Sequence, residues 1–375
     1  MKYIRPILTG IIIIAILSGC TRKFHLRRSE EIPSSPWPFT RMDPESRANI
    51  KSSFKGLLNL KWEKKVSDRP IGYLTLGGGE LIYSGSRGRV YFFDPATGKY
   101  RGRYKSRSSI QTGLTVVDSL AYFGQAPPVE RFVALNLHNQ KILWSRPLKD
   151  ITGAPIIIEN RLFLAADTGT VLCLNRESGN LVWKAEADGR STAGPSYGDG
   201  SVYLPSDKGI IQAFNAVSGE EIFKVKLNQP LMSKAAVDDR IYISGAGGGF
   251  FSLDKKTGAI GWQREFSWPI WTTPAVDSEK VYIGDNGGIL HALDKSDGHT
   301  IWEFMTNGVI VASPIIVGNY VICASLDRSI YCINKTTGLM VSKRTMKHEI
   351  RFPAISDGER IFVGAHDGTI QSFGD

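Results

Sequence analysis

The stretch Ala292-Leu293-Asp294-Lys295-Ser296-Asp297-Gly298-His299-Thr300-Ile301-Trp302 decides the fold of this 375-residue chain. It is typical of a strand end, a tight turn and a second strand that closes with a large aromatic side chain. Gly298 can adopt the positive φ that such a turn requires, and Asp294 can accept hydrogen bonds from the amides of the turn. The stretch therefore predicts a β-hairpin.

Related units recur along the chain, and their turn positions give the period. These positions are 98, 140, 179, 219, 258, 298 and 338, with Gly at each of them except Gln140. The intervals between them are 39 to 42 residues. A period of about forty residues in a β-type sequence is typical of a propeller or a solenoid. A hydrophobic content of 42% with 39 glycines suits such an all-β chain with many turns.

Each period contains two further turn signals ahead of the repeated unit. In the period that contains Gly298 they are Asp277-Ser278 and Asn286-Gly287-Gly288, and both stand between apolar runs. Such alternation of runs and turns predicts hairpins. Every period therefore predicts four short antiparallel strands, which together form one propeller blade.

The last period lacks its fourth strand. Residues 368–373 are predicted as a third strand, and the chain ends soon after it. Residues 60–64 at the other end can supply the missing strand, because Trp62 then occupies the aromatic position of the repeat. The sequence thus predicts an eight-bladed β-propeller of four-stranded antiparallel blades, closed by pairing the N-terminal strand with the C-terminal blade. Closure of this kind removes the open sheet edge.

An aromatic residue recurs on the fourth strand, and we expect it to lock adjacent blades together. Burial of one such side chain contributes roughly 2–3 kcal/mol. Gly102 and Ser342 occupy the position in the first and seventh blades, where looser interfaces are expected. The aromatic residues predicted to dock blade on blade are Trp62, Trp144, Trp183, Phe223, Trp262 and Trp302.

The N-terminus has the features of a lipoprotein leader. Two cations precede an apolar run of eleven residues, 7–17. That run is shorter than the roughly twenty residues of a spanning helix and has the length of a signal peptide. It ends in Leu17-Ser18-Gly19-Cys20, which resembles the bacterial lipobox. The resemblance implies cleavage before Cys20 and acylation of Cys20; a simple secretory signal with an incidental cysteine is the alternative.

Three segments are therefore expected: a signal peptide at 1–19, a lipidated tether at 20–35 and the propeller at 36–375. Thr21 follows the cysteine, which resembles the Gram-negative default for transport to the outer membrane, with the protein facing the periplasm. The formal net charge of +10 fits either an ordinary soluble surface or attraction to an anionic surface, formed by lipid head groups or an acidic partner. No basic helix or stacking motif indicates nucleic acid.

The ionisable residues indicate no catalytic or metal site. The six histidines are scattered, no calcium loop occurs, and the aspartates stand mostly in turns. Cys173 and Cys332 occupy positions where other blades have small residues. If a hairpin turns at 327–328, Cys323 lies opposite Cys332, so either a disulfide or two buried free thiols are possible. We predict no catalytic residue, no metal and no cofactor.

The repeated unit resembles the tryptophan-docking motif of the PQQ-dependent alcohol dehydrogenases over roughly residues 36–375. Those enzymes are longer, and many carry adjacent cysteines beside the quinone, whereas this chain has no Cys-Cys. Lipobox, short tether and compact blades together resemble the BamB family of outer-membrane β-barrel assembly lipoproteins. That resemblance implies a non-catalytic scaffold, a monomer within a complex, that docks the barrel-inserting subunit. The alternatives are a PQQ-dependent quinoprotein dehydrogenase or other PQQ-binding redox protein, and a lipoprotein that binds another polymer or protein.

Two loops are candidates for partner binding. In the BamB family the docking edge includes an acidic segment before Thr-Thr-Pro; here Trp268-Pro269-Ile270-Trp271 precedes Thr272-Thr273-Pro274. The family's Leu-x-Leu-Arg loop has a loose counterpart in residues 230–234. Trp271 either anchors a partner or fills the central channel. The predicted partner-binding residues are Trp268, Trp271, Leu231, Met232 and Lys234.

Overall fold

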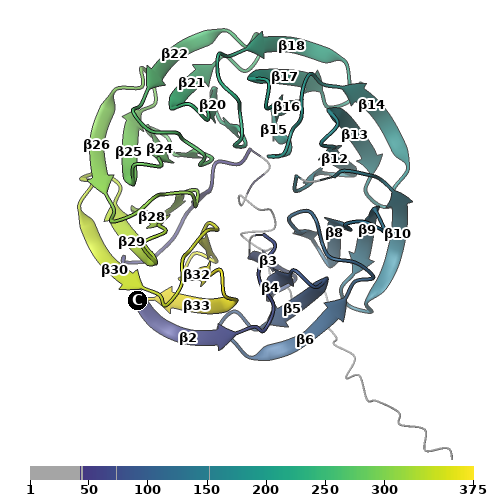
Figure 1. Ribbon diagram of the computed structural model, residues 1–375, viewed down its shortest axis with the longest axis horizontal. Coiled ribbons are helices and arrows are strands. Elements are labelled where there is room, and N and C mark those ends of the chain that lie inside the picture. The colour runs from purple at the N-terminus through teal and green to yellow at the C-terminus, as the bar shows by residue number, and fades with distance from the viewer. Residues whose placement is uncertain (1–42, 44, 73, 152) are drawn as a thin grey trace, which may run out of the picture.

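The computed structural model describes residues 43, 45–72, 74–151 and 153–375, and every regular element in this part of the chain is a β-strand. Eight sheets stand around a central axis (Figure 1). The predicted eight-bladed propeller is therefore confirmed. No helix in the described ranges is long and apolar enough to cross a membrane.

The blades follow one another in chain order, and each is built from the axis outward. Blade 1 contains β3 (Thr75–Gly77), β4 (Glu80–Gly85), β5 (Arg89–Phe93) and β6 (Tyr100–Lys105), and blade 2 contains β7 (Thr115–Val117), β8 (Leu120–Gly124), β9 (Arg131–Asn136) and β10 (Lys141–Pro147). Blade 3 contains β11 (Ile156–Ile158), β12 (Arg161–Ala165), β13 (Thr170–Asn175) and β14 (Leu181–Glu186), and blade 4 contains β15 (Ser196–Gly198), β16 (Ser201–Pro205), β17 (Ile210–Asn215) and β18 (Glu221–Lys226). Blade 5 contains β19 (Ala236–Val237), β20 (Ile241–Ser244), β21 (Gly249–Leu253) and β22 (Ile260–Glu265), and blade 6 contains β23 (Ala275–Val276), β24 (Lys280–Gly284), β25 (Ile289–Asp294) and β26 (Thr300–Met305). Blade 7 contains β27 (Ile315–Val317), β28 (Tyr320–Ala324), β29 (Ser329–Asn334) and β30 (Met340–Thr345), and blade 8 contains β31 (Ile355–Ser356), β32 (Arg360–Gly364), β33 (Thr369–Gly374) and β2 (Asn59–Lys65).

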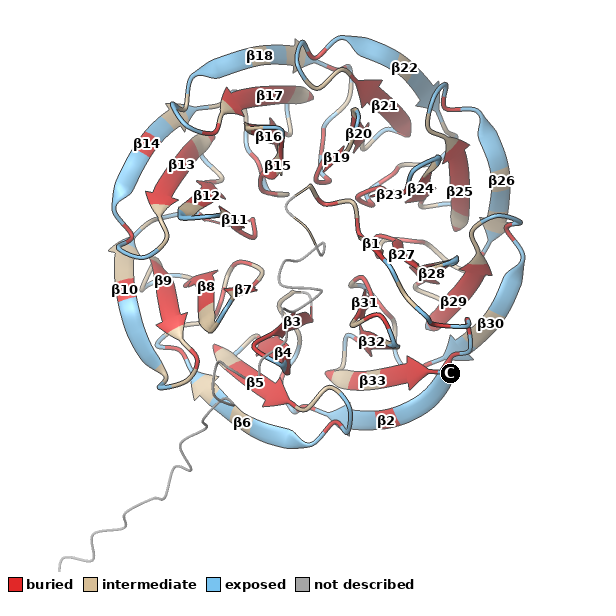
Figure 2. Ribbon diagram, turned by 180° about the vertical axis from the view of Figure 1, so that it is seen from behind, coloured by how far each residue is buried: buried red, intermediate tan, exposed pale blue. Residues whose placement is uncertain are grey.

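Burial follows the position of a strand within its blade. The three inner strands are largely buried, whereas most residues of the outer strand are exposed (Figure 2). Inner strands such as Arg161–Ala165 are apolar on both faces because a neighbouring blade covers each face. The core is therefore a series of apolar layers between blades rather than one central mass.

The eighth blade joins the two ends of the described chain. Strand β2 pairs antiparallel with β33, and Trp62 lies opposite Ser372. The order β2-β33-β32-β31 confirms the closure predicted from the incomplete last period. The ring consequently depends on residues separated by about three hundred positions in sequence.

A segment ahead of β2 crosses three blades, and the repeat did not predict it. Residues 45–50 run along the inner strands of blades 5, 6 and 7, where β1 (Asn49–Ile50) pairs parallel with β27. The carbonyls of Glu45, Arg47 and Ala48 accept hydrogen bonds of 2.8 to 3.0 Å from Val237, Val276 and Ile316. This crossing segment ties three blades together before the chain reaches the rim.

Each aromatic residue of the repeat packs against the turn of the following blade. Five indole Nε1–H groups donate to a backbone carbonyl of that turn at 2.8 to 3.1 Å. The ring then covers the turn glycine, where an added Cβ would lie 2.5 to 2.8 Å from a ring atom. Glycine is thus required both for its positive φ and for the close approach of the ring. The pairs are Trp62–Gly98, Trp144–Gly179, Trp183–Gly219, Phe223–Gly258, Trp262–Gly298 and Trp302–Gly338.

The two exceptions to the aromatic repeat have matching changes across their interfaces. Gly102 has no aromatic side chain, and the facing turn of the next blade has Gln140, with a φ of 56°, in place of the turn glycine. Ser342 instead donates a 2.6 Å hydrogen bond to the carbonyl of Gly56. The seventh interface is therefore closed by a polar contact to the segment ahead of β2.

The expected alignment of Cys323 with Cys332 is wrong. Cys323 lies opposite Tyr331, and Cys332 lies opposite Ile322. The hairpin loop has three residues centred on Asp327, with Arg328 at a φ of 72°, rather than a two-residue turn. A shift of one residue places the two side chains on opposite faces of the sheet. Both thiols are free and buried, and burial raises the pKa of Cys332 to about 12.

Candidate docking face

One face of the ring carries both the loops between blades and the second hairpin turn of every blade. An amide of that turn donates to a carbonyl of the loop entering the same blade, at 2.8 to 3.0 Å in all eight blades. We call this side the loop face. The donor–acceptor pairs are Ser86–Arg69, Ala126–Ser109, Asp167–Asp150, Asp207–Arg190, Ala246–Pro230, Asn286–Pro269, Leu326–Val309 and His366–Glu349.

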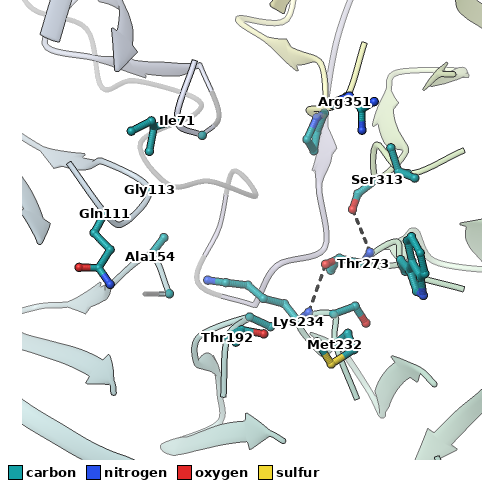
Figure 3. A pocket seen from close by; sticks show the side chains of 17 residues that line it. Ile71, Gln111, Gly113, Ala154, Thr192, Met232, Lys234, Thr273, Ser313 and Arg351 are labelled. Carbon is teal, nitrogen blue, oxygen red and sulfur yellow. Dashed lines mark hydrogen bonds between the residues drawn. The ribbon is translucent and has the colours of Figure 1, made fainter. Parts of the chain in front are cut away.

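A cavity of about 260 Å³ lies at the centre of the loop face (Figure 3). Its lining comes from the starts of the inner strands and is mostly small, apolar or hydroxylated. Lys234 and Arg351 are the cations of the described lining, and Trp271 is its aromatic residue. The described lining contains no Asp, Glu, His or Cys. It offers donors to an anionic group but no carboxylate to a divalent ion.

The loop entering blade 6 presents two exposed indoles. The side chains of Trp268 and Trp271 are 52% and 51% exposed, although large aromatic residues are usually buried. Trp271 borders the cavity, while Trp268 lies over Gly287, where an added Cβ would come within 2.2 Å of the indole. Trp271 therefore lines the channel mouth and still offers half of its surface to solvent.

The backbone around these indoles is held firmly. Thr272 is fully buried, and its hydroxyl donates to the carbonyl of Gly284 at 2.8 Å and accepts from the amide of Gly284 at 3.1 Å. The amide of Thr273 donates to the hydroxyl of Ser313 at 2.9 Å, which links blade 6 to blade 7. The exposure of the tryptophans is consequently a property of an ordered loop.

The neighbouring loop contributes less than the sequence suggested. Met232 is 43% exposed and borders the cavity beside Trp271. Leu231 is only 2% exposed and packs in the apolar layer between blades 4 and 5, so it supports the loop and offers no surface to a partner. Lys234 is largely buried, and its amide donates to Thr273. Its side chain points into the cavity (Figure 3).

A buried histidine under the Trp268 loop was missed from the sequence. His291 contacts Asp285 at 3.0 Å through Nε2 and Glu303 at 2.9 Å through Nδ1. Its ring lies 4.5 Å from that of Phe266, between centroids. The only sequence signal was a histidine at a β25 position where the equivalent strands carry Leu172 or Gln212. We interpret this cluster as a brace for the turn that contains Gly287.

One further group of ionisable side chains lies on the opposite side of blade 6. Ligand atoms of Asp294, Asp297 and His299 lie within 4.8 Å of one another. Asp294 Oδ1 accepts from the amide of Ser296, and Asp297 Oδ1 from the amide and Nδ1 of His299. These bonds build the hairpin turn that the sequence predicted, and we assign no metal to it.

Comparison with known proteins identifies the family. A family model described as "Outer membrane protein assembly factor BamB" matches residues 59–185 and 167–373. The chain belongs to this family. BamB of Yersinia pestis is 22% identical over 296 residues, which cover 71% of this chain and 72% of that protein. BamB of Burkholderia pseudomallei is 23% identical over 180 residues, 44% of this chain and only 46% of the relative.

The fold is shared more widely than the BamB family. The crystal structure of BamB from Moraxella catarrhalis superposes with a TM-score of 0.71 at 18% identity, over 85% of this chain and all of that chain. A europium-containing methanol dehydrogenase gives 0.74 at 13% identity, over 91% of each chain. The quinoprotein alcohol dehydrogenase PedH of Pseudomonas putida is 26% identical over 162 residues, 34% of this chain and 27% of PedH. Structural likeness at such identities shows the fold alone.

Proposed function

We propose that this protein is a lipid-anchored scaffold of the outer membrane that faces the periplasm. In this proposal it assists the assembly of outer-membrane β-barrel proteins by docking a component of the assembly machinery, without catalysing a reaction. Membership of the BamB family supports the role. The observation that carries the docking step is the pair of half-exposed indoles, Trp268 and Trp271, on an ordered loop of the loop face.

The anchor rests on Cys20, which lies outside the described residues together with the signal peptide and the tether. Several acyl chains hold a protein on a membrane far more firmly than one, because each buried methylene contributes about 0.8 kcal/mol. Cys20→Ser should therefore release the protein from the outer membrane. Metabolic labelling with a fatty-acid analogue tests the attachment, and equal labelling of the mutant would refute it.

Trp268, Trp271 and Met232 form the proposed docking surface. Tryptophan and methionine are enriched in the cores of interfaces, and a few such anchors usually carry most of the binding energy. Because the indoles are already ordered and half exposed, a partner could bury them without unfolding the loop. Lys234 and Arg351 border the same surface, where Arg351 pairs with Glu349 at 2.6 Å.

The test is capture of assembly components from detergent-solubilised envelopes. Trp268→Ala with Trp271→Ala should weaken capture at least tenfold, about 1.4 kcal/mol, with a nearly unchanged melting temperature. The matched control is Leu181→Ala with Ile222→Ala, which removes side chains that are 58% and 44% exposed on outer strands. Full capture by the tryptophan variant, or a much lower melting temperature, would show that the indoles serve the core.

The second candidate is a PQQ-binding redox protein, favoured by the relationship to PedH. A quinoprotein needs a divalent ion and a nearby carboxylate as base. Lys234, Arg351 and Trp271 could hold a planar anion, but the described cavity lining has no carboxylate for the ion or the base. We therefore expect no dye-linked alcohol oxidation with added PQQ and calcium; saturable PQQ binding with such oxidation would favour this candidate.

A further inference from the structure

The positive charge of the chain is concentrated in one sector of the ring. Residues 51–107 contain 13 Lys and Arg against four Asp and Glu, a net charge of +9. Residues 108–375 contain 25 against 28, a net charge of −3. The excess therefore belongs to β2, the outer strand of blade 8, and to blade 1.

Within this sector the cations gather on two neighbouring outer strands, β2 and β6 (Figure 1). Both strands are exposed along most of their length (Figure 2). We call these strands with their flanking cations the basic rim. Its exposed cations are Lys55, Lys61, Lys64, Lys65, Lys99, Arg101, Arg103, Lys105 and Arg107.

Most cations of the basic rim have no anionic partner among the described residues. Lys65 pairs with Asp367 and Arg101 with Asp94, and Lys61 donates to the carbonyl of Asp375. No ion pair within the described ranges involves the other six. Clustered like charges repel one another and lower the stability of the fold. Binding of an anionic surface or molecule would relieve this repulsion.

In other blades, several cations of the hairpin turns are paired with the preceding blade. At four of the interfaces, those between blades 2 and 3, 4 and 5, 5 and 6, and 6 and 7, a cation of one hairpin turn lies within 3.2 Å of an aspartate in the blade before it. These turn cations have an anionic partner within the ring, whereas most cations of the basic rim have none among the described residues. The pairs are Arg176–Asp118, Lys255–Asp199, Lys295–Asp238 and Lys335–Asp277.

Large apolar side chains lie among the cations of the basic rim. Leu57 and Leu60 are 47% and 52% exposed, and Tyr100 at the start of β6 is 51% exposed. Cationic side chains with interspersed leucine and aromatic residues suit the boundary between lipid head groups and acyl chains. An acidic protein would neutralise the cations of the basic rim. It would not by itself provide an apolar layer behind an anionic layer, as a lipid surface does.

We propose that the basic rim rests on an anionic lipid surface, so that the propeller stands on the edge formed by blades 8 and 1. Anionic lipid attracts each nearby Lys or Arg, and the attraction fades within a Debye length. A lipid on Cys20 would hold residue 43 within about 80 Å of the membrane, from the length of an extended chain of that many residues. A weak surface contact then suffices, because the tether makes it intramolecular.

Vesicle binding by a chain that starts at Thr21 tests the proposal without an acyl anchor, and it retains every strand of the closed ring. We expect co-sedimentation with phosphatidylcholine vesicles that contain about 30% phosphatidylglycerol, loss of binding as salt rises from about 50 to about 500 mM, and little binding to pure phosphatidylcholine. Lys64→Glu, Arg103→Glu and Lys105→Glu together should lower the partition coefficient at least tenfold.

The matched control changes the net charge equally at exposed sites on other blades. Lys141→Glu, Lys226→Glu and Lys256→Glu together should lower the partition coefficient less than threefold; none of the three lysines has an ion pair within the described residues. Equal losses of vesicle binding in both triple variants would show that net charge alone determines binding, and would overturn the proposal. Binding of a polyglutamate column through the basic rim without vesicle binding would also overturn it, in favour of an acidic protein. Capture of assembly components is measured separately, so failure here leaves the docking proposal standing.

Discussion

The contact between a turn glycine and the aromatic side chain of the preceding blade is the smallest contact that holds neighbouring blades together. Blade 4 allows this contact to be separated from backbone strain. Gly219 has a φ of 79° and lies under Trp183, whereas Gly200 has a φ of 77° with no atom within 4 Å of an added Cβ. The two glycines have nearly the same φ, and only Gly219 is covered by an indole ring.

Gly200→Ala should cost about 1–2 kcal/mol of unfolding free energy, because only the left-handed conformation is penalised. Gly219→Ala should cost about 1–3 kcal/mol more, because its Cβ would lie 2.6 Å from the indole and force it away. Urea denaturation of both variants measures the difference. Equal losses would mean that the indole moves aside freely and does not lock the blades.

The first residue of the repeated turn is Asp in some blades and Asn in others, which predicts a dependence on pH. The amides of Thr257 and Lys256 and the hydroxyl of Thr257 hold the pKa of Asp254 below its usual value. Asn215 and Asn334 accept equivalent amide hydrogen bonds without a charge. Around pH 4 the folded Asp254 binds fewer protons than the unfolded chain, so its contribution is present above that pH and is lost on acidification.

Asp254→Asn should leave the melting temperature near neutral pH almost unchanged. Between pH 5 and pH 3, roughly the range in which an Asp titrates, the variant should lose less stability than the parent chain. Asn215→Asp provides the reciprocal variant and should lose more. Thermal melts across this range decide the matter: parallel curves for the three proteins would show that the turn does not contribute to acid sensitivity.

At the scale of elements, β2 is the strand on which closure depends. It supplies the outer strand of blade 8 and places Trp62 on Gly98 of blade 1, so it closes two sheet interfaces at once. Deletion of residues 57–66 should abolish cooperative melting, a larger effect than the usual 0.5–3 kcal/mol of a point mutation. Calorimetry measures this loss.

Trp62→Phe is the matched control for that deletion, because Phe223 of blade 4 already fills the same position over Gly258 of blade 5. It should keep a single cooperative transition at a moderately lower temperature. A deletion variant that melts like the parent chain would show that the ring closes through the crossing segment instead.

The sequence predicted those elements whose signal repeats. The forty-residue period, the turn glycines and the position of Trp62 were sufficient for eight blades and their closure. The register of the hairpin at Asp327 was not predictable, because a two-residue and a three-residue turn share the same apolar flanks. The repeat did not indicate the crossing segment either, because its contacts join residues far apart in sequence: backbone carbonyls accept from three blades, Arg47 contacts Asp238 and Asn49 donates to the carbonyl of Val276.

The candidate site was less predictable than the fold for a physical reason. Exposure of Trp268 and burial of Leu231 depend on the neighbouring blade, and no local pattern reports that packing. His291 was likewise invisible as part of a cluster until β25, β26 and the turn at Asp285 came together. Residues that serve the repeat can thus be predicted from it, whereas residues that interrupt the repeat need the assembled ring.

On the scale of the whole molecule, a contact between the basic rim and lipid would fix the orientation of the propeller relative to the membrane. If the basic rim touches lipid, the axis of the ring runs along the membrane, and the loop face is presented sideways to partners seated in the same membrane. Strands β2 and β18 lie on opposite sides of the ring (Figure 1); β2 carries Lys64 and β18 carries Lys226. A probe at position 64 should therefore be close to lipid and a probe at 226 far from it.

Single variants Lys64→Cys and Lys226→Cys of the lipidated protein allow this to be measured. The remaining cysteines, Cys173, Cys323 and Cys332, are buried with raised pKa values, so a maleimide dye should react only at the new thiol. Nitroxide-labelled lipid in anionic vesicles should quench the dye at 64 several-fold more than the dye at 226, because the ring separates them. High salt should reduce this difference, since the Debye length then falls to about 3–5 Å. Equal quenching at both positions would mean that the propeller tumbles on its tether, and the basic rim would then have no lasting contact with the membrane.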